Sequence, residues 1–262
     1  MPDQVSVIYV VPSDREPWRE AQLRATECLE DLQWFFADEM TRLGYEPKTF
    51  DIARDESGLV LFHEINSELE ASAFRDHYWQ HCKNTARTLR DGNQVIVYFF
   101  EAYFLGNKTT NTSAGSRGGR NRRGRGGEAF LSSLHLKLAR RDWLGRDDGY
   151  EGKVFEWIDP SPLEPGSFSW NCRGPALGDV SGAGFGVIAH EFAHCFGPPP
   201  QERSRCSRYG PLMGAGCRGM RGFFRPNETN DRCFLRPGDG AVFDDNSFFG
   251  LRELKPRSES FG

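Results

Sequence analysis

The sequence predicts an α/β fold in which helices pack on one mixed sheet. Three observations carry this prediction. Strand-length apolar runs occur at residues 5–11 and 94–100, a helix-period apolar stripe lies between Pro17 and Gly44, and the first elements follow the order β-α-β-β-α-β. The chain has 262 residues, of which 38% are hydrophobic and 21 are Phe, so it can bury a sizeable core. Because no linker divides the chain, we predict one domain over residues 1–262.

The first two elements are a buried strand and a long amphipathic helix. Residues 5–11 (VSVIYVV) are mostly β-branched and lie between turn formers, which favours a buried strand. Pro17 suits the first turn of the following helix, and Gly44 suits the position just after its end. Between them, apolar residues recur every three or four positions and form one core-facing stripe. The stripe consists of Trp18, Ala21, Ala25, Cys28, Leu32, Phe35, Phe36, Met40 and Leu43.

The next segments predict a hairpin and a second long helix. Lys48–Ile52 and Leu59–His63 flank the turn-forming sequence RDESG, so we expect these two strands to pair with each other. Ser67 and Glu70 have the spacing of a capping box, which predicts a helix from there to about Arg90.

The middle of the chain is rich in glycine and arginine. Residues 105–128 carry five Arg among many Gly and show no apolar periodicity, so we expect a mobile surface loop. Residues 129–144 regain apolar content that fits either a helix or a strand. Lys153–Ile158 is expected to be one short strand among ordered loops. We therefore divide the domain into a sheet-and-helix part, residues 1–181, and a loop-rich part, residues 182–262.

Composition and charge exclude several classes of protein. The net charge of −4 does not fit a general nucleic-acid binder, and no apolar run approaches the length of a membrane span. The N-terminus lacks a basic start, so we see no signal peptide and expect a cytoplasmic protein. The seven cysteines include no CxxC pair, which argues against a zinc ribbon, and because no signal peptide is visible we expect mostly reduced thiols. The redox state of Cys206, Cys217 and Cys233 stays open, as does the oligomeric state.

A metal-binding pattern lies within residues 182–197, GAGFGVIAHEFAHCFG. His190 and His194 are four residues apart, so on a helix their rings share one face and can bind one ion. Glu191 projects beside that face and can accept a proton from water that the metal activates. The pattern HExxH therefore predicts zinc ligands at His190 and His194 and a general base at Glu191. The alternative is a helix whose histidines are only packed or solvated.

The same segment resembles a known family of peptidases. HEFAHCFG at 190–197 resembles HExxHxxG, the opening of the metzincin zinc peptidases, and PLMG at 211–214 resembles their Met-turn. The run is also similar to uncharacterised bacterial metallopeptidases, whose N-terminal part resembles residues 34–52. This resemblance implies a zincin-type α/β fold with a mixed sheet, two long helices and an active-site helix that ends near Gly197. It implies zinc-dependent hydrolysis of a peptide or protein, with Met213 as an apolar support beneath the metal.

One position departs from the pattern of that family. Metzincins place a third ligand three residues after the glycine, and here that position holds Pro200, which cannot bind zinc. Glu202 and Cys206 are the nearest other donors, and the absence of any replacement is the third possibility. The alternative function is therefore a catalytically impaired pseudo-peptidase that binds partners without cleaving them.

Other signals indicate ordinary packing or solvation. His77 and His81 have the spacing of a ligand pair but no intervening Glu, so we interpret them as a packed or partly exposed helix face. The arginines between 117 and 125 resemble RNA-binding segments, yet a solvated loop fits the acidic chain better, so nucleic acid is not an expected partner. Six arginines surround the PLMG segment, and we hypothesise that they favour acidic residues in a bound peptide, the alternative being a solvated basic surface. They are Arg203, Arg205, Arg208, Arg218, Arg221 and Arg225.

Overall fold

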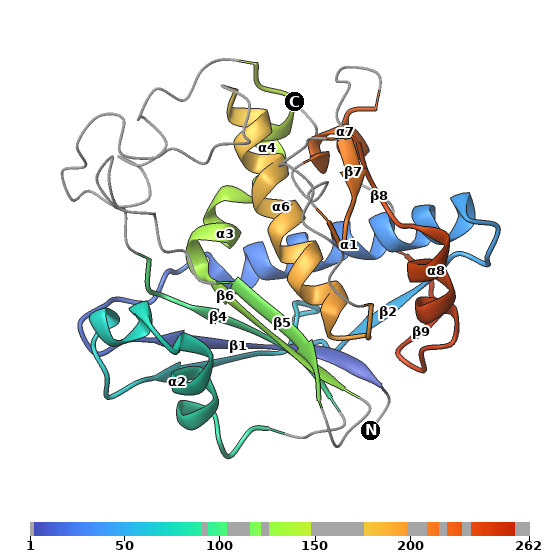
Figure 1. The fold of residues 1–262 in the computed structure, drawn as a ribbon. Helices are drawn as coiled ribbons and strands as arrows, with labels where there is room; N and C mark the ends of the chain where they lie inside the picture. The colour runs from blue at the N-terminus through green and yellow to red at the C-terminus, as the bar shows by residue number, and fades with distance from the viewer. Residues whose placement is uncertain are drawn as a thin grey trace.

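A seven-stranded mixed sheet organises the chain (Figure 1). The computed structural model describes residues 3–90, 94–103, 116–121, 126–147, 176–198, 209–214, 219–226 and 232–254. The strands are β1 (Gln4–Val11), β2 (Lys48–Ile52), β3 (Phe62–Asn66), β4 (Val95–Phe100), β5 (Ser116–Arg120), β6 (Gly127–Ser132) and β9 (Phe249–Leu251). Their order is β5-β6-β4-β1-β2-β9, and β3 also pairs with β1. The inner pairs are parallel, whereas β5 and β9 join the edges antiparallel. The predicted mixed α/β fold is confirmed.

Helices cover both faces of this sheet. α1 and α6 pack on one face with α3, and α2 packs on the opposite face (Figure 1). The helices are α1 (Ala21–Arg42), the single-turn η1 (Ala71–Arg75), α2 (Tyr78–Thr85), α3 (Ser133–Leu138), α4 (Arg141–Leu144), α6 (Leu177–His194), α7 (Arg221–Phe224) and α8 (Pro237–Asp244). A small second sheet pairs β7 (Tyr209–Pro211) with β8 (Arg232–Phe234). Because both faces are covered, every residue of β4 is buried, which explains its uninterrupted apolar sequence.

The long helix α1 matches its prediction closely. It begins at Ala21, after the predicted start near Pro17, and its apolar stripe is buried against the sheet. Gly44 has φ +88°, the left-handed conformation that suits glycine after a helix end. Among the described residues, α1 is one of the two predicted long helices, and α6 is the predicted active-site helix.

The predicted hairpin at residues 48–63 is wrong. Both β2 and β3 pair with β1 in parallel, at Gln4 with Asp51 and at Val7 with Phe62. The turn itself exists, because an isolated antiparallel bridge joins Arg54 to Val60. β1 is eight residues long, so its edge accommodates the two short strands one after the other. The sequence pattern predicts the turn correctly, but it does not predict that the strands on either side of the turn pair with β1.

The predicted continuous helix from Ser67 to about Arg90 is also wrong. The Ser67 hydroxyl accepts from the backbone N–H of Leu69, which makes a local turn instead of a capping box. η1 and α2 are separated by His77, whose φ of +56° is incompatible with a continuing helix. His81 lies on α2, half-buried against Phe74, as interpreted from sequence, whereas His77 is exposed and precedes the helix, with its ring against Trp79.

The arginine- and glycine-rich segment contains regular structure that its composition hid. Its residues 116–120 form the edge strand β5, so the expected loop over 105–128 is wrong there. Residues 129–144, which fitted a helix or a strand, contain the end of β6 and then α3 and α4. The strand predicted at Lys153–Ile158 lies outside the described residues. Within the described ranges, no helix combines the length and apolarity that crossing a bilayer requires.

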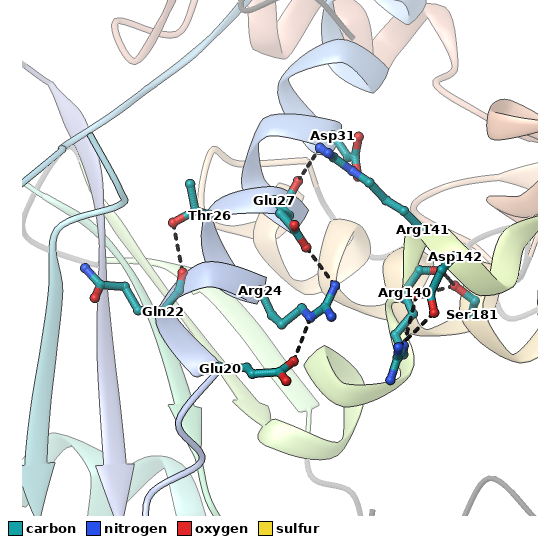
Figure 2. A network of polar contacts seen from close by, with 10 residues as sticks. All are labelled: Glu20, Gln22, Arg24, Thr26, Glu27, Asp31, Arg140, Arg141, Asp142 and Ser181. Carbon is teal, nitrogen blue, oxygen red and sulfur yellow. Dashed lines mark hydrogen bonds and ion pairs between the residues drawn. The ribbon is translucent and has the colours of Figure 1, made fainter. Parts of the chain in front are cut away.

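A polar network ties α1 to α4 and α4 to α6 (Figure 2). Arg141 Nε donates to the buried carboxylate of Asp31 at 2.7 Å, and the same guanidinium reaches the Glu27 carbonyl at 3.3 Å. The Ser181 hydroxyl donates to the Arg140 carbonyl at 2.7 Å and accepts from the Arg140 N–H at 3.1 Å. These contacts fix the N-terminal half of α6 relative to the rest of the domain.

Candidate metal centre

The HExxH residues lie at the end of α6. This helix runs from Leu177 to His194, and near its start the Asp179 carboxylate accepts from the backbone N–H of Ala176 at 3.3 Å. Gly197 has φ +121°, so the helix stops where the sequence predicted. The motif therefore occupies the last turn of a helix whose other end is anchored in the domain.

The structure brings the two predicted ligands together. The Nε2 atoms of His190 and His194 are 3.2 Å apart, and the ring planes meet at 87°. The carboxylate of Glu191 belongs to the same cluster, whose ligand atoms all lie within 4.8 Å of one another. All three side chains are half-buried, so the cluster is open to solvent on one side.

Backbone carbonyls orient both imidazoles. His190 Nδ1 lies 2.7 Å from the carbonyl oxygen of Leu212, and His194 Nδ1 lies 3.0 Å from that of Pro198. A carbonyl oxygen only accepts, so each Nδ1 is the donor in its contact, and the Nε2 of each ring is the atom left to bind a metal. Burial lowers the pKa of His194, which favours its neutral form.

This arrangement fits a metal ion. Two nitrogens that each lie about 2.05 Å from zinc at a tetrahedral angle are about 3.3 Å apart, close to the 3.2 Å seen here. Two Nε2 atoms at this separation suit a cation that both rings share. The carbonyl bonds to Nδ1 are the outer contacts that metal-binding histidines use to hold their orientation.

The segment after the helix supplies one of these contacts. The Gly214 N–H donates to the Pro211 carbonyl at 3.0 Å, which closes a tight turn around Leu212 and Met213. Met213 is buried in the main core, directly after the residue whose carbonyl holds His190. Its role as an apolar support beneath the metal stays a prediction. The position of the expected third ligand and its two possible replacements lie outside the described residues; they are Pro200, Glu202 and Cys206.

The edge strand β5 packs directly on the motif. A Cβ added to Gly118 would lie 1.8 Å from the carbonyl oxygen of Glu191, so only glycine allows this contact. At the outer edge of β5, the Tyr78 hydroxyl donates to the Ser116 carbonyl at 2.9 Å. Burial raises the pKa of Tyr78 to about 12, with a smaller contribution from the charge of Glu191. Sequence reasoning missed Gly118, Leu212 and Pro198, because they act through backbone atoms.

Arg221 does not line a substrate surface. It is buried, and its guanidinium donates to Asp179 and to the Leu144 carbonyl, each at 3.0 Å, and to Asp147. The hypothesis that Arg221 belongs to a basic wall around PLMG is therefore wrong, because its charge is used to join α7 to α4 and α6. Of the other five arginines, Arg225 is half-buried and the remaining four lie outside the described residues.

The sheet and its helices define a zincin-like mixed α/β fold, and solved structures share it. Catalytically inactive OgpA from Akkermansia muciniphila in complex with an O-glycopeptide (glycodrosocin) superposes with a TM-score of 0.61 at 18% identity. Wild-type OgpA in another crystal form has a TM-score of 0.57. The match covers 95% of this chain and 62% of the OgpA chain, so this chain spans less than two thirds of that length. Neither a protein-family model nor a curated protein sequence matches the chain significantly.

Proposed function

We propose that the protein is a zinc-dependent peptidase whose metal is held by His190 and His194. The observation that carries this proposal is the approach of the two Nε2 atoms to 3.2 Å, with each Nδ1 within hydrogen-bond distance of a carbonyl oxygen. The zincin-like fold and the similarity to OgpA, whose structure holds an O-glycopeptide substrate, support a peptidase over other metal enzymes.

Glu191 is the general base in this proposal. When bound, zinc supplies Lewis acidity, which polarises a scissile carbonyl and lowers the pKa of water. The Glu191 carboxylate accepts the proton of the attacking water and then donates it to the leaving amine. Its half-buried carboxylate, within 4.8 Å of the ligand atoms of both histidines, suits this transfer.

Metal content and cleavage test the proposal together. The purified protein should bind one zinc per chain, and His194→Ala should lose it, whereas the control His81→Ala should not. Glu191→Gln should keep zinc but cleave a quenched fluorescent peptide library about 10²–10⁴-fold more slowly. Failure of the wild-type protein to bind added zinc would contradict the proposal.

A pseudo-peptidase is the second candidate, because Pro200 stands where the related pattern has its third ligand. Binding of zinc and peptides without cleavage would favour it. The assay panel should include O-glycosylated peptides beside their unmodified forms, because OgpA is seen with an O-glycopeptide. Faster cleavage of the glycosylated forms would extend the proposal to glycopeptides.

A further inference from the structure

The outer edge of β5 has backbone groups available for pairing. The Asn121 N–H donates to the Gly126 carbonyl, so in this antiparallel register Gly119 and Arg117 also bond to β6. The backbone groups of Ser116, Gly118 and Arg120 therefore point away from the sheet. The Tyr78 hydroxyl already bonds to the Ser116 carbonyl. Among the described residues, no further hydrogen bond engages the outward backbone groups of Gly118 and Arg120, and Gly118 packs on Glu191 of the metal cluster.

Two exposed arginines lie on this edge strand. Arg117 projects toward α2, where its guanidinium stacks 4.6 Å above the Trp79 ring. Arg120 projects to the opposite face, where its guanidinium lies beside Gly197, just past the metal-binding motif. Across the described ranges, neither guanidinium makes an ion pair with a carboxylate.

The nearest carboxylate on the neighbouring strand is not available to them. Glu128 lies opposite Gly119 in the register, but it is buried and already holds Lys83 at 2.9 Å and Arg90 at 2.8 Å. Among the described residues, the edge strand therefore presents two arginines without an ion-paired carboxylate, although the whole chain is net negative. Charges left open beside a binding edge favour ligands of the opposite sign.

We infer that Arg117 and Arg120 select peptides with acidic side chains, bound as an added strand along β5. The inference rests on the proposed function, because it names the substrate class of the same site. Side chains of an extended peptide alternate between faces, and Arg117 and Arg120 lie on opposite faces three residues apart. The preferred ligand therefore carries two acidic residues three positions apart.

Binding to the zinc-loaded Glu191→Gln variant separates recognition from cleavage. The probes are ten-residue peptides with an uncharged dye, carrying Asp at positions i and i+3, Asp at i and i+2, or Asn at i and i+3. Fluorescence anisotropy should show the tightest binding for the i, i+3 Asp peptide, by about threefold per arginine over its Asn counterpart. This preference should shrink as salt rises.

Charge removal at the two arginines tests their role directly. Arg117→Ala and Arg120→Ala should each lower the Asp-over-Asn preference, and the lysine variants should keep much of it. The control is Arg252→Ala, which removes an exposed charge just after β9, at the opposite edge of the sheet. The inference is overturned if the Asp and Asn peptides bind equally. It is also overturned if the Asp-over-Asn preference is unchanged in the double alanine variant, and both results count even if the native protein cleaves peptides. A preference that depends on both arginines, found in a protein that cleaves nothing, upholds the inference and rejects the peptidase.

Discussion

Replacing Gly118 with alanine should separate the edge strand from the metal-binding helix. The new Cβ would lie 1.8 Å from the Glu191 carbonyl oxygen and 2.6 Å from its carbon, both backbone atoms that no side-chain rotation can move. Ordinary contact begins near 3.4 Å, so β5 and α6 must part by roughly 1.6 Å along this direction. Overpacking of this kind costs about 1–3 kcal/mol of unfolding free energy. The motif should also lose zinc affinity, because the new methyl group would displace the Glu191 backbone, which lies between the two histidines.

The neighbouring glycine gives a matched control. A Cβ at Gly119 meets nothing within 4 Å, so Gly119→Ala should be neutral or slightly stabilising, by up to about 1 kcal/mol. Urea unfolding gives the free energies, and competition with a fluorescent chelator gives the zinc affinities. Equal stability and equal zinc affinity of the two variants would refute the claim that β5 and α6 touch at Gly118.

Three further predictions concern buried charges and thiols. Arg221→Met removes the cation from the buried Asp179 carboxylate and should destabilise the protein by about 3–5 kcal/mol in urea unfolding, whereas adding Asp179→Asn should recover much of the loss. Burial lowers the pKa of His194, so the zinc-free protein should lose stability as pH falls through about 6.5, and urea midpoints of His194→Gln should fall less. Burial raises the thiol pKa of Cys28 and Cys82, so a thiol reagent should modify them only after unfolding, and rapid modification in the native state would contradict this.

The features predicted correctly from sequence are those set by local spacing. The position of His190 four residues before His194 places both rings on one helix face without reference to any other segment. The stripe of α1 and the left-handed Gly44 are likewise decided within a few turns of chain. Local spacing does not predict strand pairing where a strand has two possible partners. β2 and β3 could pair with each other, but both pair with β1.

The contacts that orient the site come from distant segments through backbone atoms. The Leu212 carbonyl holds His190, and any residue at that position offers the same carbonyl, so residue type carries no signal. Gly118 is visible in the sequence as a glycine, but a glycine among arginines also fits a flexible loop. The structure shows that this loop interpretation is wrong at β5. Arg221 was assigned to a surface because its two carboxylate partners, Asp147 and Asp179, are remote in sequence.

The glycines that precede the motif are explained by the same close packing. Glycine costs a helix about 1 kcal/mol relative to alanine, so a glycine-rich stretch would by itself weaken α6. A Cβ at Gly182 would lie 2.6 Å from the backbone nitrogen of Arg221, and one at Gly184 would lie 2.8 Å from that of Ala139. Gly118 makes the equivalent contact from β5 near the other end of the helix. Three segments thus come into close contact with the backbone of α6. The apolar surface buried in these contacts offsets the low helix propensity of the glycines, and the contacts hold the two histidines in place.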